Sequence, residues 1–240
     1  MRLDLALVDR GLARSRSHAR QLIELDRVHV PGAVVKPSMR VDETTTINVF
    51  TDPYVSRGAH KLIHALNESG LTISGRVLDA GASTGGFTQV LLESGAQRVY
   101  AVDVGHDQIV GFLREDPRVV IREGLNLRDL SLDDLESELV DCVVCDISFI
   151  SVRLILAQIL SVLKPDGVAL ILVKPQFEVG RSALDSHGVV MDEHKRELAV
   201  CEVVDHAQQL GWYLQWSAPS VLTGEKGNQE TFCLFRMHPK

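Results

Sequence analysis

The sequence has no hydrophobic run long enough to cross a membrane. A spanning helix needs about 18 consecutive apolar residues, whereas the longest useful apolar stretch, Val168–Val173, is closed by Lys174. The first residues, Met1-Arg-Leu-Asp-Leu, also lack the apolar segment of a secretory signal peptide. We therefore expect a cytoplasmic protein with no membrane partner.

Cysteine is scarce and offers no disulfide framework. The 240 residues include four: Cys142, Cys145, Cys201 and Cys233. Cys142 and Cys145 have a C-x-x-C spacing, but both lie in an apolar run typical of a strand, where residues three apart point to opposite faces. We therefore expect four buried free thiols in a reducing compartment and no metal site.

Repeats and low-complexity segments are also absent, and the composition is ordinary, with 45% hydrophobic and 24% charged residues. The length allows one large domain, or one large and one small. Residues 1–40 carry a formal charge of +4, whereas the remaining 200 residues carry −11. A basic N-terminal module on an acidic body suggests contact with a polyanion, although a solvated basic face would give the same pattern.

The most informative stretch is residues 77–87, which read Val-Leu-Asp-Ala-Gly-Ala-Ser-Thr-Gly-Gly-Phe. An apolar strand ends there in Asp79, turns through a Gly-rich loop and opens a helix at Gly85. The next apolar strand ends in a second acid, Asp103. This layout is typical of a nucleotide-type ligand that is held above the carboxyl ends of parallel strands, with the second acid bonding ribose hydroxyls.

The chemistry of this loop narrows the ligand. A dinucleotide fingerprint requires Gly where this chain has Ser83, and Asp79 would repel a pyrophosphate. The cationic end of S-adenosylmethionine would instead be attracted. A tight turn without ligand is the alternative, and for Asn126 a helix-capping role fits equally well. The predicted cofactor-binding residues are Asp79, Gly81, Ala82, Ser83, Gly85, Gly86, Phe87, Asp103 and Asn126.

Hydrophobic periodicity predicts alternating strands and helices beyond residue 56. The expected strands cover 76–79, 98–103, 118–122, 141–146, 167–173, 212–218 and 230–236. The expected helices cover 56–68, 85–94, 107–114, 132–139, 149–163 and 192–210. The alternation predicts an α/β fold with a doubly wound, Rossmann-like sheet of the S-adenosylmethionine-dependent methyltransferase type, closed by an antiparallel hairpin. The segment 176–190 could be a lid or a surface loop.

The N-terminal residues predict a small α+β module, with helices over 3–10 and 17–25 and strands over 28–30 and 46–50. Leu3-Asp4, Leu7-Val8, Gly11-Leu12-Ala13, Ser15-Arg16, Ala19-Arg20 and Leu22-Ile23 resemble the S-four-type RNA-binding domain of ribosomal proteins. That resemblance implies binding of structured RNA through its shape and phosphates. We expect an RNA-binding domain over 1–50, a linker over 51–55 and a second domain over 56–240. The predicted RNA-binding residues are Arg14, Arg16, Arg20 and Arg57.

Two charged residues directly follow apolar strands of the predicted sheet. Asp146 follows the fourth strand and Lys174 the fifth, so both would lie at the ligand-binding edge. Exposed strand ends without a chemical role are the alternative interpretation.

Longer motifs then resemble the TlyA family, FtsJ-like ribosomal RNA ribose 2′-O-methyltransferases that are often labelled hemolysins. The motifs are Ser56-Arg-Gly-Ala-His-Lys-Leu62, residues 79–87, Asp146-Ile-Ser-Phe-Ile-Ser151, Val173-Lys-Pro-Gln-Phe-Glu-Val-Gly180 and Gly227-Asn228-x-Glu230. The resemblance implies a catalytic set of Lys61, Asp146, Lys174 and Glu230. It further implies S-adenosylmethionine as cofactor and ribosomal RNA within ribosomal subunits as partner, with a cytidine ribose as the target.

A ribose hydroxyl must lose its proton as the methyl group moves, so the reaction needs a base. An ordinary lysine, with a pKa near 10.4, is almost fully charged at pH 7, but a second cation and partial burial would lower that pKa. We assign Lys174 as general base, Lys61 as its cationic neighbour, Asp146 as the group that orients Lys174, and Glu230 as a holder of lysine. A non-catalytic RNA-binding ribosome factor and a cytolysin are the alternative functions.

Overall fold

The computed structural model describes residues 1–24, 27–49 and 52–237, apart from the side chain of Gln21. The chain divides into two compact units, Met1–Pro53 and Tyr54–Lys240. This division falls inside the predicted linker 51–55, of which residue 51 lies outside the described part of the chain. The predicted domain boundaries themselves stay a prediction.

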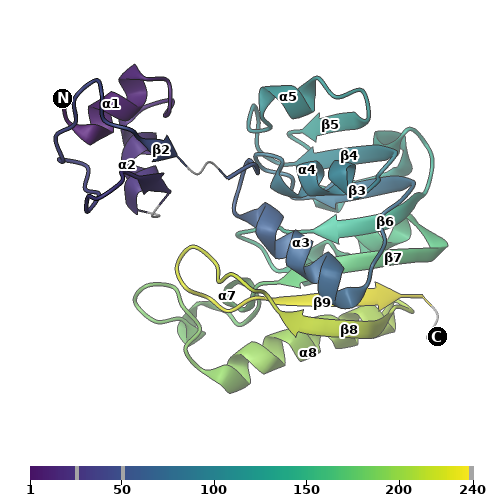
Figure 1. Cartoon of the computed structure of the whole chain (residues 1–240). Helices are drawn as coiled ribbons and strands as arrows, with labels where there is room; N and C mark the ends of the chain where they lie inside the picture. The colour runs from purple at the N-terminus through teal and green to yellow at the C-terminus, as the bar shows by residue number, and fades with distance from the viewer. Residues whose placement is uncertain (25–26, 50–51, 238–240) are drawn as a thin grey trace. The chain divides into compact units, whose positions relative to one another are not determined.

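The N-terminal unit contains two short helices, α1 (Leu3–Asp9) and α2 (Arg16–Glu24), and a two-stranded antiparallel sheet (Figure 1). Its strands, β1 (Val28–His29) and β2 (Asn48–Val49), are shorter than predicted, and residues 25 and 50 of the predicted elements lie outside the described residues. The apolar faces of both helices meet in one small core around Leu3, Leu7 and Ile23. The α+β expectation for this unit is confirmed.

A seven-stranded sheet forms the centre of the larger unit, in the order β5-β4-β3-β6-β7-β9-β8 (Figure 1). Its strands are β3 (Arg76–Ala80), β4 (Arg98–Asp103), β5 (Val119–Glu123), β6 (Val140–Cys145), β7 (Leu163–Val173), β8 (Tyr213–Pro219) and β9 (Thr231–Arg236). The strands from β3 to β7 are parallel to their neighbours, whereas β9 runs antiparallel to both β7 and β8. The doubly wound sheet with a terminal antiparallel hairpin is thus confirmed.

Alternate residues of each strand supply two cores, one on each face of the sheet. Leu78 and Tyr100 belong to the core that α8 (Glu193–Gln209) and α6 (Leu156–Ser161) cover. Val77 and Val99 belong to the opposite core, under α3 (Gly58–Ser69) and α4 (Gly86–Glu93). Because strand residues alternate in this way, every central strand is buried on both faces, as is usual for parallel sheets.

Three predicted helices are wrong in extent. The helix expected over 107–114 is only α5 (Gly111–Arg114), and Asp107 has a left-handed backbone with φ of 55°. The helix over 132–139 is one 3-10 turn, η2 (Leu132–Leu135), because Glu136 leaves the helix at φ 60° and its carboxylate meets the guanidinium of Arg98 and the hydroxyl of Tyr100. Such long-range contacts override local propensity.

The segment predicted as a helix over 149–163 begins as a loop. It continues as the 3-10 turn η3 (Val152–Leu154) and α6, and β7 already begins at Leu163. Two further short elements, the 3-10 turns η1 (Leu127–Asp129) and η4 (Arg181–Ala183), were not predicted. A single helical turn, α7 (Pro175–Glu178), opens the segment 176–190. Pro175 at its first position suits a helix start because proline has no N–H to leave unpaired there.

The cysteines follow the predicted alternation but not entirely the predicted burial. Cys142 and Cys145 belong to cores on opposite faces of the sheet. Cys142, Cys145 and Cys233 are buried, and burial raises the pKa of each thiol to about 12. Cys201 is exposed on α8, so the expectation of four buried thiols is wrong at that position. Cys201 lies on a helix, so the strand alternation used for Cys142 and Cys145 could not predict its exposure.

Candidate active site

The strand order reverses beside β3, because β4 pairs with one side of β3 and β6 with the other. The loops after β3 and β6 therefore diverge at this edge of the sheet, where α/β proteins bind ligands. Gly81 sits at this point with φ of 95°, and a Cβ there would lie 2.7 Å from the carbonyl oxygen of Asp146. Only glycine allows the two loops to approach so closely.

A cavity of about 420 Å³ opens at the diverging loops, a size suited to a small-molecule ligand. Its wall combines backbone from the loop after β3, the acid at the end of β4 and residues of the loop after β6. The residues that line it include Gly81, Ser83, Asp103, Val104, Gly105, Gln108, Asn126, Asp146, Ile147, Ser148 and Phe149. Four of the nine predicted cofactor-binding residues are in this lining: Gly81, Ser83, Asp103 and Asn126.

The other five predicted cofactor residues do not line the cavity. Phe87 is buried against Phe232, with its ring stacked at 6.4 Å, and Ala82 is buried in the same core. Gly85 and Gly86 serve close packing, since a Cβ would lie 2.4 Å from Leu113 or 2.0 Å from the Ser56 hydroxyl. Part of the Gly-rich pattern therefore lets α4 approach its neighbours, and ligand contact by these five residues stays a prediction.

Asp79, the fifth, is fully buried at the end of β3. Its Oδ2 accepts a 2.6 Å hydrogen bond from the hydroxyl of Thr88, whereas its Oδ1 has no partner among the described residues. Burial raises the pKa of this carboxyl to about 7, and the negative charges of Asp146 and Asp103 add to the effect. A buried acid of this kind binds a proton near neutral pH, or its charged form is stabilised by a nearby cation.

Asp103 and Asn126 are both fixed by backbone groups. The Asp103 carboxylate accepts hydrogen bonds from the backbone N–H of Ser83 at 2.9 Å and of Gly105 at 2.7 Å. Asn126 accepts from the N–H of Arg128 and thereby caps η1. The capping role is thus confirmed for Asn126, which also lines the cavity; its contact with a cofactor stays a prediction.

The four residues of the predicted catalytic set form two ion pairs. Lys174 Nζ lies 2.6 Å from Asp146 Oδ1, and Lys61 Nζ lies 2.6 Å from Glu230 Oε2. Both pairs are largely shielded from water, with the lysine side chains each 10% exposed. Val173 at the end of β7 pairs with Thr231 at the start of β9. Lys174 comes directly after Val173 and Glu230 directly before Thr231, so both lie at the same edge of the sheet.

This pairing differs from the arrangement expected for Lys61. Lys61 was expected to be the cationic neighbour of Lys174, but in the structure its charge is matched by Glu230 inside the protein. The holding role expected of Glu230 is thus directed at Lys61. Each lysine has its own carboxylate, which is the arrangement that buried charges require.

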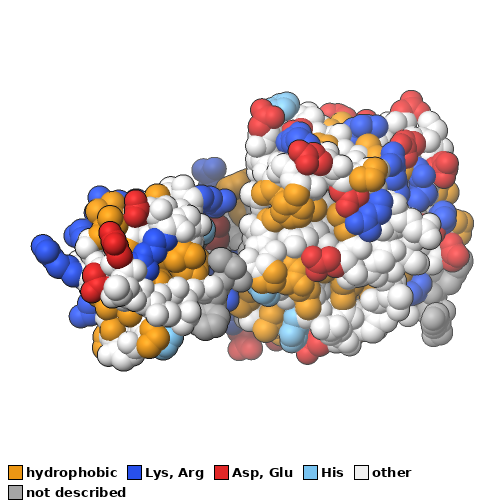
Figure 2. All heavy atoms as spheres, turned by 45° about the horizontal axis from the view of Figure 1, so that its top comes forward, with side chains coloured by type: hydrophobic (Ala, Val, Ile, Leu, Met, Phe, Trp, Pro, Cys, Tyr) orange, Lys and Arg blue, Asp and Glu red, His pale blue; other side chains and the backbone are white. Residues whose placement is uncertain are grey.

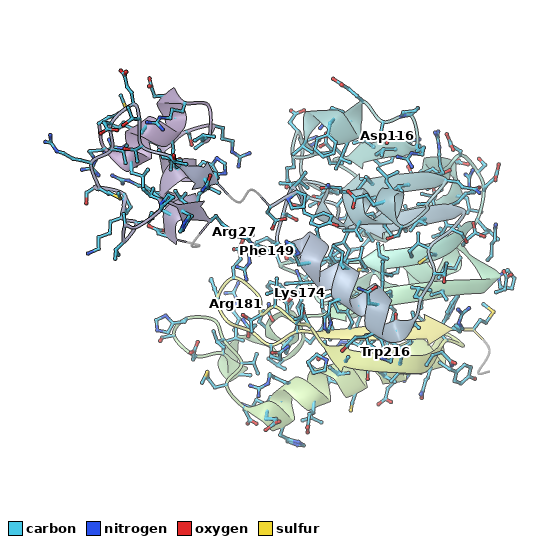
Figure 3. The ribbon with its side chains drawn as sticks, viewed as in Figure 1. Arg27, Asp116, Phe149, Lys174, Arg181 and Trp216 are labelled. Atoms are coloured by element: carbon cyan, nitrogen blue, oxygen red, sulfur yellow. The ribbon has the colours of Figure 1, made fainter. Side chains whose placement is uncertain are left out.

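Three neighbours of the set were not singled out from the sequence. The ammonium of Lys174 donates to the hydroxyl of Ser148 at 2.9 Å, and the amide of Gln176 donates to Glu230 at 3.4 Å. Phe149, 89% exposed at the cavity rim, has a left-handed backbone with φ of 74°. Figure 3 labels Phe149 and Lys174 at the same edge of the sheet. An aromatic residue directly after a predicted catalytic strand end was the available signal.

Two of the four predicted RNA-binding arginines, Arg16 and Arg20, share an acidic partner with Arg2, which was not predicted. The fully buried carboxylate of Asp4 accepts from Nε of Arg16 at 3.0 Å, of Arg20 at 3.3 Å and of Arg2 at 3.0 Å. The three guanidinium side chains remain 41% to 50% exposed, and blue side chains are spread over this unit in Figure 2. Arg14 is exposed just before α2, and Arg57 is exposed in the larger unit before α3.

Comparisons with known proteins agree with this geometry. The model of the FtsJ-like methyltransferase family matches residues 54–237, and that of the S4 domain matches residues 1–47. A structure from Listeria monocytogenes described as an S-adenosylmethionine-dependent methyltransferase has the same fold, with a TM-score of 0.56 at 15% identity over 76% of this chain and 99% of the other. The fold and the site define an FtsJ-like methyltransferase with an N-terminal S4 domain.

The particular family follows from whole-length relatives. The chain is 46% identical over 240 residues to the 16S/23S rRNA (cytidine-2'-O)-methyltransferase TlyA of Mycobacterium tuberculosis, which covers 98% of this chain and 89% of the relative. A structure from Streptococcus thermophilus described as a hemolysin superimposes with a TM-score of 0.77 at 34% identity over 98% of this chain and 87% of the other. The chain belongs to the TlyA family, as its motifs suggested.

The hemolysin label carried by some relatives invites a search for membrane-spanning segments. Over the part of the chain that the structure describes, no helix combines the length and apolar character needed to cross a bilayer.

Proposed function

We propose that this protein transfers the methyl group of S-adenosylmethionine to the 2′-hydroxyl of a cytidine ribose in ribosomal RNA. The observation that carries the proposal is the pair of lysine–carboxylate contacts, Lys174–Asp146 and Lys61–Glu230, at the sheet edge that also holds the cavity. A binding module without chemistry would have no use for two shielded lysines there. The name of the Mycobacterium tuberculosis relative supports the ribosomal RNA target.

The residues at the cavity fit S-adenosylmethionine. Asp103 is fixed by two backbone N–H groups with its carboxylate in the lining, where it would bond the ribose hydroxyls. The Asp103 carboxylate also adds to the rise in the pKa of buried Asp79, so negative charge beside the cavity would favour a sulfonium and an ammonium group. When bound, the cofactor supplies an electrophilic methyl group on its positively charged sulfur.

Lys174 is the proposed general base. Its Nζ is fixed between Asp146 and Ser148, so the amine has a defined direction. In its neutral form it would take the proton from the 2′-hydroxyl as the oxygen attacks the methyl carbon. Asp146, in contact with Lys174 and in the cavity wall, would orient the amine and stabilise the lysine once it has gained the proton.

Lys61 and Glu230 have a different proposed role. Glu230 is held on one oxygen by Lys61 and on the other by Gln176. This network fixes the Lys61 ammonium on α3 at the edge of the sheet, where it would attract the phosphate next to the target ribose. Fixed groups of this kind contribute to catalysis by aligning the hydroxyl with the methyl donor.

The N-terminal unit would hold the RNA. Arg2, Arg16 and Arg20 present half-exposed guanidinium groups that suit phosphate oxygens. At the cavity rim, the exposed ring of Phe149 offers a surface on which a base can stack once it has left its helix. Together these features favour a structured RNA whose target nucleotide is turned out of its stack.

The direct test is to incubate purified 30S and 50S ribosomal subunits with the protein and with S-adenosylmethionine carrying a labelled methyl group. Mapping by nuclease digestion and mass spectrometry should show one or two cytidines with a 2′-O-methyl ribose. Methyl groups on a base, or on protein only, would contradict the proposed reaction. A Lys174→Ala protein is the control, since it should bind S-adenosylhomocysteine but leave the RNA unmodified.

A further inference from the structure

The loop after β6 is held in place by the short helix α7, although the two are far apart in the sequence. We call residues 148–153 of that loop the rim loop, because Ser148, Phe149 and Ile150 line the cavity. Phe149 adopts a positive φ of 74° with its side chain 89% exposed. A bulky residue keeps such a conformation only where its surroundings determine it strongly.

Those surroundings come from Glu178 at the end of α7. Its side chain is 1% exposed, and one carboxylate oxygen, Oε1, accepts from the backbone N–H of Val152 at 2.8 Å. The other oxygen, Oε2, accepts from the hydroxyl of Ser151 and from Nε of Arg153 at 3.1 Å. A single buried acid therefore satisfies three donors of the rim loop, directly after the strained residue.

Other residues of α7 also contact the rim loop and the ion pairs. Phe177, the residue before Glu178, lies against Phe149 with ring centroids 5.8 Å apart. Gln176 donates to Glu230, and Lys174, which precedes the helix, contacts Ser148 and Asp146. One helical turn thus touches both ion pairs and the rim loop, so a change at its end would be felt at the reacting groups.

We infer that Glu178 is a positioning residue for methyl transfer, one that fixes the rim loop so that Ser148 and Phe149 stand in place for the incoming nucleotide. This inference rests on the proposed function for its effect on catalysis. Glu178 does not line the cavity, so it acts through the loop. Its loss should lower turnover on RNA while leaving the cofactor's affinity nearly intact.

The test compares Glu178→Gln with Glu202→Gln. Glu202 is the matched control because it pairs with the same guanidinium, Arg153, at 2.9 Å but from the exposed side of α8. Glutamine at 178 keeps the shape but directs an N–H₂ group at donors. We expect kcat on ribosomal subunits to fall at least tenfold in Glu178→Gln and to stay within twofold in Glu202→Gln, with S-adenosylhomocysteine affinity unchanged in both.

A second readout does not depend on methyl transfer. Chymotrypsin cleaves after exposed phenylalanines, and a released rim loop should be cut after Phe149 at least tenfold faster in Glu178→Gln. Cleavage after Phe112, 56% exposed on α5, is the internal reference and should not change. If wild-type protein methylates no ribosomal RNA, the proposed function fails, whereas the ratio of the two cleavage rates still tests Glu178.

The outcomes separate positioning from general stability. Equal kcat and equal cleavage after Phe149 in the two variants would overturn the inference. If Glu178→Gln also accelerates cleavage after Phe112, the fold itself has loosened. Ser151→Ala, which removes one of the three donors, is then used instead. In that variant we expect kcat to fall, and cleavage after Phe149 to accelerate, several-fold. In a Phe149→Ala background the Glu178→Gln effect on kcat should largely disappear, since both act through one loop; additive losses would contradict the inference.

Discussion

Asp4 in the N-terminal unit and Asp79 in the larger unit are both fully buried, yet their carboxyl groups meet opposite surroundings. Three arginines donate to Asp4 and hold its pKa well below the usual range. Asp79 accepts from Thr88 and forms no ion pair among the described residues, so burial raises its pKa to about 7. Burial alone therefore does not decide the charge of an acid; its hydrogen-bond partners do.

The difference matches the ligands that the two units are proposed to bind. Around Asp4 the positive charges outnumber the negative one and reach the surface, which suits a polyanion such as RNA. Around Asp79 the acids Asp103 and Asp146 add negative charge, of which only that of Asp146 is matched by Lys174. The negative charge that remains suits a cationic cofactor. Each unit thus carries an excess of one charge that the opposite charge of its proposed ligand would neutralise.

The largest effect is expected for a variant that should stop methyl transfer without changing the binding of RNA or cofactor. Lys174→Ala removes the proposed base, so methyl transfer should fall about 10²- to 10⁴-fold. RNA affinity and S-adenosylhomocysteine affinity should change less than threefold, because neither the arginines around Asp4 nor the acids of the cavity are altered. Single-turnover assays with labelled cofactor measure methyl transfer. Filter binding measures the RNA affinity, and calorimetry measures the S-adenosylhomocysteine affinity. Retained turnover would exclude Lys174 as the base.

The next effect tests the raised pKa of Asp79. Because the folded pKa of about 7 exceeds that of an unfolded aspartate, the wild-type protein should lose stability as pH rises from about 4 to above 7, by up to about 4 kcal/mol. Asp79→Asn, which keeps an acceptor for Thr88, should remove this loss. Urea unfolding at pH 5 and pH 8 measures the difference. Equal pH dependence in both proteins would show that Asp79 is ionised without penalty.

For Asp4 the sign is opposite. Its folded pKa is lower than the unfolded one, so its stabilising effect is present above about pH 4 and is lost as the pH falls further. Asp4→Asn should therefore destabilise the N-terminal unit most at pH 7 and progressively less as the pH falls below about 4. It should also weaken RNA binding roughly tenfold, the size of one charge-assisted hydrogen bond. The matched control is Asp9→Asn, an acid at the end of α1, and an equal loss in that variant would argue against a special role of Asp4.

The smallest effect concerns the thiols. Cys201 is exposed, whereas Cys142, Cys145 and Cys233 are buried with raised pKa values. A maleimide at pH 7 should therefore modify Cys201 alone in the native protein, with no loss of methyl transfer. Mass spectrometry of the labelled peptides identifies the site. Labelling of Cys142 or Cys145 under native conditions would indicate that the sheet opens far more readily than its burial implies.

Much of this fold could be predicted because its signals are local. The apolar runs that become β3, β4, β6 and β7, and the Gly-rich turn after β3, each follow from residues close in sequence. The helix expected over 132–139 failed because Glu136 bonds Arg98 and Tyr100 from a distant strand. The predicted cofactor set matches the cavity lining only in part for a similar reason, since Gly85 and Gly86 serve close packing that no local pattern distinguishes from ligand contact.

The sequence by itself determined the class of sheet, the basic N-terminal module and the placement of Asp146 and Lys174 after their strands, because strand periodicity and composition are properties of the linear chain. Only the tertiary structure decided which lysine pairs with which acid, why Asp79 and Asp4 differ, and that Glu178 holds the rim loop. These are contacts between segments that are far apart in sequence, and their energies depend on burial and distance, which exist only once the chain has folded.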